Sequence, residues 1–565
     1  MSTAKRVYFY LVYFITLGMF SGGVGILLRI CFDLLTRPAA PQIGAPSFAK
    51  EMLSLGLAML VIGGVLWFLF WRAIRRNVAE NPAETGSAIR KLFLNLILAA
   101  SALVGLFAAV SFLRWLLAGP SLNLFPSTEL TNLIVTGVIW YYHWRLTEGE
   151  GQPSPEARTL RRWYVYFLSG WGLVSLSINL VLLVNTAVLY LPVWGTAAIS
   201  GKFWNISVQS SLSWILLGGL VWFFHWFRMA RGDSDSTLRQ VYLYLLAILG
   251  GLMAGLVALS MTLFKIFSFA FGGAGSSGSA YFQLLGWTVP TMLVAAAAWL
   301  YHTRVTQEEA AQVQQRLSAR RVHSYLMSFI GLGTLIGGLI ILLGVLLDVL
   351  IHTIGAKTVV VTPGWWHDQL SACLALLVVA TPIWLYYWNR VLRMAAAGGV
   401  TERRAMSRRI FLYTVVGAAI IALATDLVYI VYRMLNGLLQ GSFGVSVLRY
   451  SEWSLQSLLV AIPVLWYHWR ILRQDQRLGA EKLPRRKTVT LLAGEAAVDL
   501  VSRIEAKLGS RVRVLRYLGQ RPEDMPVLSD EEVDRLVSDI QEAPSDKVLL
   551  IAAGNKVTVV PYQEK

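Results

Sequence analysis

Long apolar runs, separated by short polar stretches, dominate the first 480 residues. Each of six segments opens on a basic residue followed by aromatic residues, at Arg6, Arg90, Arg161, Arg239, Arg320 and Arg408. After a polar or glycine-rich gap, each continues into a second apolar run whose aromatic-basic ending closes at Arg72, Arg145, Arg228, Arg304, Arg390 and Arg470. Because roughly 20 apolar residues span a bilayer core of about 30 Å, the pattern predicts six helical hairpins, hence twelve membrane-spanning helices.

A finer alternation groups these hairpins in pairs. The even-numbered hairpins close on Tyr-His-x-Arg, beginning at Tyr142, Tyr301 and Tyr467, and an acidic residue follows at Glu148, Glu308 and Asp475. The odd-numbered hairpins close instead on an aromatic-Trp pair, at Trp71, Trp226 and Trp388. The sequence therefore predicts three tandem four-helix modules, which cover residues 1–155, 156–312 and 313–480.

The pattern changes near residue 480, where a small α/β domain is expected over residues 486–565. Strands are predicted at 488–492 and 512–518 and a helix at 495–508, and Ser529 with Glu532 forms a capping box before a second helix. Two further strands are predicted to meet at Gly554-Asn555. The expected fold class is thus an all-α transmembrane bundle of twelve helices with a small C-terminal α/β domain.

Composition and charge fix the class of protein and its orientation. The chain of 565 residues is 56% hydrophobic and 15% charged, with a mean hydropathy of +0.57, which excludes a soluble protein. The net charge of +18 lies largely in short loops between hairpins, so it reports topology and does not indicate a nucleic-acid partner. The positive-inside rule predicts that both termini lie in the cytoplasm, and we expect the protein in the plasma (inner) membrane of a bacterial cell.

Starts such as "RRIFLY" and endings such as "WYHWR", in tandem modules, are similar to the prokaryotic membrane family called domain of unknown function 5671. The similarity covers about residues 1–480 and does not obviously include the C-terminal domain. The resemblance implies a multi-pass membrane protein in tandem copies, and the family supplies no activity to carry over.

Histidines stand out among the chemically reactive side chains. Four of the seven occur at one depth, in the endings of four hairpins, and the interfacial motif they form with neighbouring arginines comprises His143, Arg145, His225, His302, Arg304, His468 and Arg470. Haem or metal ligation would need these histidines to face one another. The other two hairpins carry Phe70 and Tyr387 there, so we favour anchoring and packing between repeats, and we expect no cofactor or metal. The two cysteines, Cys31 and Cys373, exclude a disulfide framework.

Ionisable or amide side chains deep in a span are costly and are functional candidates by default. The candidate polar pathway comprises Asp426, Arg433, Asn179 and Asn185. The structural alternative is an internal ion pair for Asp426 and hydrogen bonds between helices for the asparagines. The glycine pairs Gly18/Gly22, Gly251/Gly255 and Gly333/Gly337 have the spacing that permits close helix packing.

These features favour a membrane scaffold or sensor that presents its C-terminal domain to an unidentified cytoplasmic protein, with the lipid bilayer as its surroundings. The alternative is a transporter or channel whose polar pathway runs between modules. An enzyme is not expected, because no span holds paired carboxylates, a histidine-rich metal motif or a nucleophile with its base.

Overall fold

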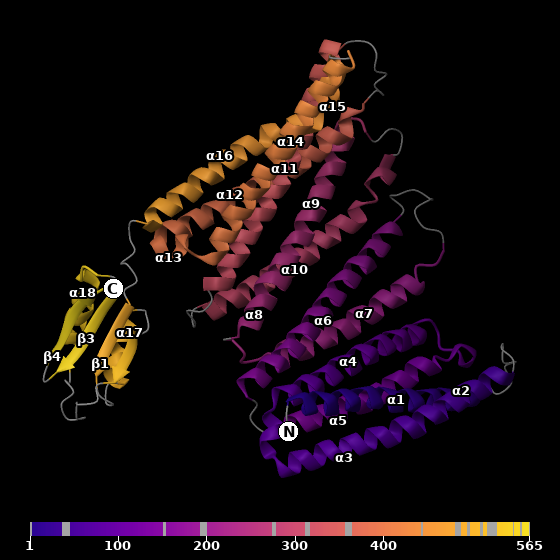
Figure 1. Cartoon of the computed structure of the whole chain (residues 1–565). Helices are drawn as coiled ribbons and strands as arrows, with labels where there is room; N and C mark the ends of the chain where they lie inside the picture. Colours follow the sequence, from indigo (N-terminus) through magenta and orange to yellow (C-terminus); the bar gives the residue numbers. More distant parts are fainter. Residues whose placement is uncertain are drawn as a thin grey trace. The chain divides into compact units, whose positions relative to one another are not determined.

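The computed structural model describes most of the chain, and Figure 1 shows the arrangement of its elements within each part. The described residues are 3–36, 46–150, 154–191, 201–234, 236–273, 278–310, 317–355, 364–441, 444–480, 488–493, 498–508, 512–516, 528–545, 547–553 and 556–563.

Ten of the described helical segments are long and apolar enough to cross a membrane. They lie at 3–36, 50–80, 88–117, 156–189, 206–229, 237–270, 280–309, 320–351, 366–397 and 406–439. The helices that form them are α1 (Thr3–Thr36), α2 (Pro46–Ala58), α3 (Gly64–Glu80), α4 (Ala88–Leu117), α6 (Pro155–Leu189), α7 (Ile206–Phe223), α8 (Thr237–Val241), α9 (Leu249–Ala270), α10 (Leu285–Ala310), α11 (Leu317–Gly355), α12 (Trp366–Ala397) and α14 (Met406–Leu439). A multi-pass membrane protein is therefore confirmed.

Two further long helices, α5 (Ser127–Glu148) and α16 (Glu452–Ala480), do not belong to these ten. Polar residues explain the difference, since α5 carries Thr131, Asn132 and Thr136, and the end of α16 is rich in arginine. Length and hydropathy thus support ten spans, and the predicted twelve stays a prediction. Short helices α13 (Gly399–Arg403) and α15 (Val445–Tyr450) complete the helical part.

Glycine lets the two helices of each odd-numbered hairpin touch backbone to backbone. A Cβ atom on Gly23 of α1 would lie 2.5 Å from the amide nitrogen of Leu60, and one on Gly172 of α6 would lie 2.6 Å from that of Trp222. The glycine pairs predicted from spacing fare differently. Gly251 does pack closely, since its Cβ would lie 3.3 Å from the Ala295 carbonyl oxygen, but a Cβ on Gly18, Gly333 or Gly337 would meet nothing within 4 Å. Close packing was therefore wrongly predicted at these three positions.

Several helices depart from regular α geometry. Pro290, Pro382 and Pro463 lie inside α10, α12 and α16, where each removes a backbone hydrogen bond. Three π-helical segments interrupt other spans, at Met59–Gly63, Phe224–Met229 and Tyr242–Ile248. Such segments are often found at functional sites, and the second contains His225.

The C-terminal domain has a four-stranded sheet in the order β2-β1-β3-β4. Strands β1 (Thr488–Ala493), β2 (Val512–Arg516) and β3 (Lys547–Ala553) are parallel, and β4 (Lys556–Tyr562) pairs antiparallel with β3. Helices α17 (Val498–Leu508) and α18 (Asp530–Glu542) supply Ile504 and Ile540 to its buried core. The capping box of Ser529 and Glu532 is confirmed, whereas the Gly554-Asn555 turn lies outside the described residues.

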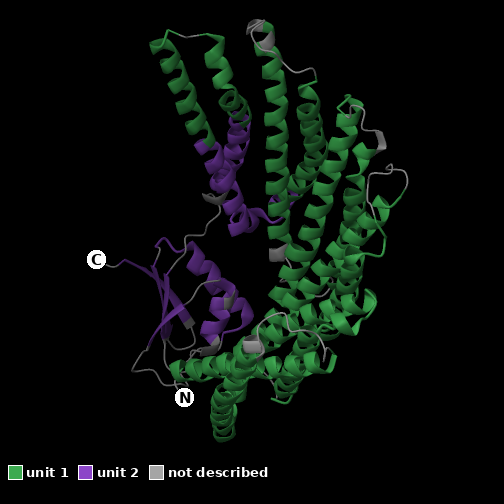
Figure 2. Ribbon diagram, turned by 90° about the vertical axis from the view of Figure 1, so that its right-hand side faces the viewer, with its two compact units in different colours: residues 1–392, 422–460 green, residues 393–421, 461–565 purple. Residues whose placement is uncertain are grey.

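The chain divides into two compact units, coloured separately in Figure 2. The first comprises residues 1–392 and 422–460, and the second comprises residues 393–421 and 461–565. The three predicted modules do not correspond to this division, and their boundaries stay predictions.

Candidate functional site

An ion pair with a buried carboxylate joins the two ends of the first hairpin. In the first module (residues 1–155), Arg6 of α1 lies 2.9 Å from the carboxylate of Glu84, which follows the second helix in the 3₁₀ turn Pro82–Gly86. The hydroxyl of Tyr10, one helical turn after Arg6, donates to the same carboxylate at 3.4 Å. The side chain of Glu84 is 1% exposed. We call such an arginine-carboxylate pair, which ties the start of a hairpin to its end, a clasp.

The second hairpin has its own clasp, and Tyr10 connects the two. Lys91 Nζ donates to Glu150 Oε2 at 2.6 Å, and Arg90 Nε donates to Glu150 Oε1 at 2.9 Å. A second nitrogen of Arg90 donates to the Tyr10 hydroxyl at 3.2 Å. A continuous chain of charge-assisted hydrogen bonds therefore runs through both hairpins of the first module.

The second module (residues 156–312) repeats this chain in the same order. Arg162 Nε and the Tyr166 hydroxyl each donate to Asp233 at 2.8 Å, with the arginine and tyrosine again four residues apart. Arg239 then donates to Glu309 at 2.9 Å and interacts electrostatically with Tyr166. Its guanidinium also lies over the Trp226 ring, 4.5 Å from the centroid.

Two of the acidic residues that follow the Tyr-His-x-Arg endings form ion pairs with arginines. Glu148 pairs with Arg161, and Asp475 accepts hydrogen bonds from Arg403 at 2.8 Å and from Arg408 at 2.6 Å. The clasp carboxylates of the first two modules are Glu150 and Glu309, two residues after Glu148 and one after Glu308.

The alternation of hairpin endings also has a structural cause. Trp71, which closes the first hairpin, donates its indole N–H to the Tyr142 hydroxyl in the Tyr-His-x-Arg ending of the second hairpin, at 2.8 Å. Trp226 donates to Tyr301 at 2.7 Å in the same way. In the first two modules, the odd-numbered ending is thus the hydrogen-bond donor for the even-numbered ending of its own module.

All four histidines of the interfacial motif are buried, whereas its arginines are exposed. His143, His225, His302 and His468 are at most 5% exposed, while Arg145, Arg304 and Arg470 are exposed. In each histidine, Nδ1 lies 2.7 to 2.8 Å from the carbonyl oxygen four residues earlier, so Nδ1 carries the proton and Nε2 is an acceptor. The histidines therefore pack between helices, and only the arginines fit the expected anchoring role. Among the described residues, no three His, Cys, Asp or Glu side chains form a group that could hold a metal ion.

The partner of Nε2 differs between modules. The Tyr13 hydroxyl donates to Nε2 of His143 at 3.0 Å, and the Tyr164 hydroxyl donates to Nε2 of His225 at 3.3 Å. His302 corresponds to His143, but Ser169 stands in the register position of Tyr13, seven residues after the clasp arginine. The Nε2 atom of His302 is buried with no hydrogen-bond partner among the described residues.

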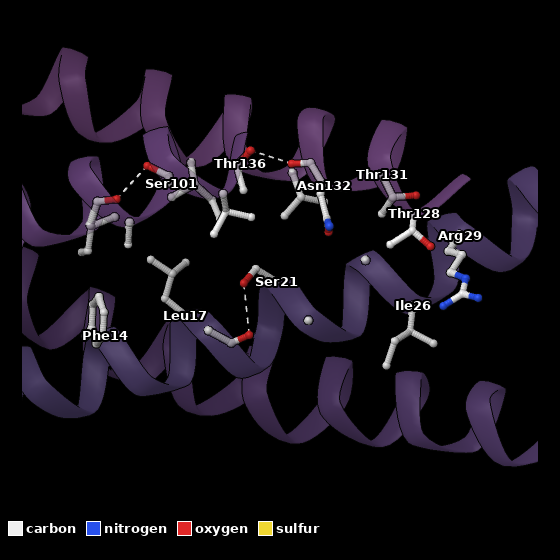
Figure 3. Close-up of a pocket in the computed structure, with 18 of the residues that line it drawn as sticks. Phe14, Leu17, Ser21, Ile26, Arg29, Ser101, Thr128, Thr131, Asn132 and Thr136 are labelled. Atoms are coloured by element: carbon white, nitrogen blue, oxygen red, sulfur yellow. Dashed lines mark hydrogen bonds between the residues drawn. The ribbon is translucent and has the colours of Figure 1, made fainter. Parts of the chain in front are cut away.

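A cavity of about 510 Å³ lies between α1, α4 and α5 of the first module. Figure 3 shows Ser21 and Arg29 of α1 facing Thr128, Asn132 and other polar residues of α5 across it. The volume falls in the range of roughly 300–1,000 Å³ that is usual for small-molecule sites. This cavity was missed by sequence reasoning, although the polar residues at 128, 131, 132 and 136 follow the spacing of one helix face and could have indicated it.

The residues of the predicted polar pathway do not assemble. Arg433 stacks on Tyr429 and Tyr450, with its guanidinium carbon 5.1 and 4.7 Å from their ring centroids, and no ion pair with Asp426 is found among the described residues. Asp426 is 7% exposed, and its Oδ2 atom has no hydrogen-bond partner there.

The two asparagines of that pathway lie on α6. Asn179 donates to the Ser175 carbonyl of its own helix at 2.8 Å, so the predicted hydrogen bond between helices is wrong for this residue. The amide oxygen of Asn185 faces Gly286 of α10, where a Cβ atom would lie 3.0 Å from it.

Comparison with protein-family models identifies a family. The model of the family described as Domain of unknown function (DUF5671) matches residues 6–126, 189–293, 246–353 and 321–451, which confirms tandem copies. No curated protein and no solved structure matches the chain.

Proposed function

We propose a function from one premise: the chain belongs to the family described as Domain of unknown function (DUF5671) and is a multi-pass membrane protein. The function that its geometry supports best is a membrane scaffold of twelve spans that presents the C-terminal α/β domain to a protein partner in the cytoplasm. The proposal includes both termini in the cytoplasm of a bacterial cell, as the distribution of basic residues indicates.

The observation that carries the proposal is the repeated chain of clasps. The side chain of Glu150 is 7% exposed, and it pairs with Arg90 and Lys91, whose side chains are 5% and 4% exposed. Losing one partner of a buried ion pair typically costs about 3–5 kcal/mol. Pairs of this kind resist the separation of hairpins that a transport cycle would require. Two successive modules with the same chain therefore favour a static frame.

Cysteine accessibility tests the proposed orientation. In a Cys31→Ser/Cys373→Ser background, single cysteines would replace Glu531 in α18 and Lys202 between α6 and α7. A membrane-impermeant maleimide should label the Glu531→Cys protein only in inverted vesicles and the Lys202→Cys protein only in right-side-out vesicles. Labelling of both from the same side would contradict the topology.

The environment of Asp426 favours the alternative function, a transporter or channel. A buried carboxylate oxygen without a partner in the described structure is what a proton or cation pathway would use. For a scaffold, proteoliposomes should show the proton and ion leak of protein-free liposomes, measured with pH- and voltage-sensitive dyes. A leak that Asp426→Asn abolishes and that Glu80→Gln, a change to an exposed carboxylate outside the candidate pathway, leaves intact would favour the transporter.

A further inference from the structure

We propose that the cavity of the first module binds a long-chain carboxylate, that is, one hydrocarbon chain with an anionic head. The cavity opens between α1, α4 and α5, and its polar side chains without hydrogen-bond partners among the described residues, such as Thr131, lie toward one end. Such a separation is the complement of a single-chain amphiphile.

Polar groups without partners gather at the end of the cavity that is remote from the clasps. Thr131 is 2% exposed, and its hydroxyl has no hydrogen-bond partner among the described residues. Thr128 and the side-chain amide of Asn132 lie beside it in Figure 3, and Arg29 reaches the same end from α1. Ser21, Ser101 and Thr136 differ, because they donate to carbonyls of their own helices and so offer a ligand less.

Arg29 retains the capacity to bind an anion. Its Nε lies 3.6 Å from Asp33, too far for a strong hydrogen bond, and its side chain is 54% exposed. The other carboxylate oxygen of Asp33, Oδ1, accepts a hydrogen bond from Ser127 at 2.6 Å, so Arg29 is not the sole partner of this carboxylate. Because a guanidinium has five N–H donors in a planar fork, donors remain to bind a carboxylate.

The rest of the cavity suits a hydrocarbon chain. Phe14, Leu17, Ile97, Val104 and Ile139 line it toward the clasp end. A Cβ on Gly18 would meet nothing within 4 Å, so this glycine leaves open the space that a side chain would fill.

The second module carries bulkier residues at the same register positions. Counting from the clasp arginines, Val174 and Ile178 replace Gly18 and Gly22, and Asn185 replaces Arg29. Counting from the paired histidines, Trp287 and Pro290 replace Thr128 and Thr131. Both the space and the anion-binding group therefore belong to the first module.

Photolabelling tests the proposal. The full chain in nanodiscs of zwitterionic lipid would be labelled with a diazirine analogue of palmitate, competed with unlabelled palmitate or hexadecanol, and digested for mass spectrometry. We expect saturable labelling of peptides from α1 and α5. Gly18→Val should reduce the affinity for both competitors at least about tenfold, whereas Gly137→Val, on α5 outside the cavity and equally open at its Cβ, should leave it unchanged.

The head group is tested by the charge at position 29. Arg29→Gln should lower the affinity for palmitate at least about tenfold and the affinity for hexadecanol by less than about twofold. Arg29→Lys should retain most of the affinity for palmitate. Arg433→Gln, a change to a different arginine, should alter neither affinity. Equal losses for palmitate and hexadecanol in Arg29→Gln would overturn the carboxylate assignment. Labelling that does not saturate, or that survives Gly18→Val, would overturn the site itself.

Discussion

The first two modules have the same frame and different interiors. Arg6, Tyr10 and Glu84 correspond to Arg162, Tyr166 and Asp233. In both modules the tyrosine donates to the carboxylate of the first clasp and interacts with the arginine of the second, by a hydrogen bond in the first module and electrostatically in the second. Away from the clasps the two modules diverge. The first has a largely apolar cavity with polar groups at one end, and it pairs His143 with Tyr13. The second has valine and isoleucine in place of the cavity glycines and leaves His302 Nε2 without a described partner.

The comparison shows that the residues that join the hairpins are distinct from the residues that line the interior of a module. The clasps depend on a few charged residues near the helix ends, so a repeat can keep them while its middle changes. A ligand site needs only glycines and polar residues on facing helices, and one module can have it while another does not. The modules should therefore respond alike when a clasp is broken and differently when their interiors are changed.

The largest expected effect comes from removing a clasp carboxylate. Glu150→Gln leaves both Arg90 and Lys91 buried without their anion, so the free energy of unfolding should fall by about 3–5 kcal/mol. Glu309→Gln should cost less, because its partner Arg239 is more exposed and also contacts Trp226. Thermal and denaturant unfolding of the purified chain would measure both.

Glu80→Gln, which breaks an exposed pair with Arg76, is the control. Equal losses of stability in all three variants would show that the clasps do not hold the hairpins together.

Replacing the corresponding histidines, His143 and His302, should destabilise the first module more than the second. His143→Leu removes a hydrogen bond and leaves the buried Tyr13 hydroxyl unsatisfied, at a cost of about 1–3 kcal/mol, whereas His302→Leu removes an Nε2 atom that has no described partner. Adding Tyr13→Phe to His143→Leu should restore part of the loss, because both polar partners are then gone. Unfolding measurements on the double-mutant cycle decide this, and a larger loss for His302→Leu would reverse the comparison.

The C-terminal domain provides a reference that neither module should influence. Ser529→Ala removes the hydroxyl that caps α18 and should destabilise this domain by about 1 kcal/mol. Hydrogen exchange by mass spectrometry should show faster exchange in α18 and β3 and unchanged exchange in α1 to α10. Altered exchange in the modules would mean that the frame depends on this domain.

Acidification should have the smallest effect, confined to the same domain. Hydrogen bonds from Arg503 and from the Ser529 backbone lower the pKa values of Asp530 and Glu532 below their ordinary 3.8 and 4.5. Since the folded-state pKa is the lower one, the stabilisation is present above these ordinary values and is lost as the pH falls through the folded pKa. Exchange in α18, corrected for the intrinsic rate, should rise between pH 6 and pH 3.5. Arg503→Gln should remove the contribution of Asp530 and so reduce the rise, and a rise of equal size in that variant would refute the assignment.

Periodicity and charge predicted much of the frame because both are local properties of the chain. The hairpins, the capping box at Ser529 and the strands of the C-terminal sheet follow from apolar spacing and capping preferences. The clasps themselves were not predicted, because the sequence shows acidic residues after the endings but not which of them reaches a buried arginine.

The interior was harder to predict because it depends on which helix faces meet. GxxxG spacing indicates small residues but cannot distinguish a close contact at Gly251 from an open space at Gly18. Likewise, Asp426 and Arg433 are spaced for an ion pair, yet the tyrosines around Arg433 offer its cation aromatic faces instead.

The most direct test of a static, clasped frame is a distance measurement by double electron–electron resonance in lipid nanodiscs. In a background with Cys31 and Cys373 replaced by serine, spin labels would be attached to single cysteines at two exposed positions. Leu122 lies between α4 and α5 of the second hairpin, and Phe203 lies between α6 and α7 of the third. We predict one narrow distance distribution, unchanged by pH or added salt, that broadens in Glu150→Gln. Two distinct populations in the protein with intact clasps, exchanging with pH or ions, would contradict the scaffold and favour a transporter.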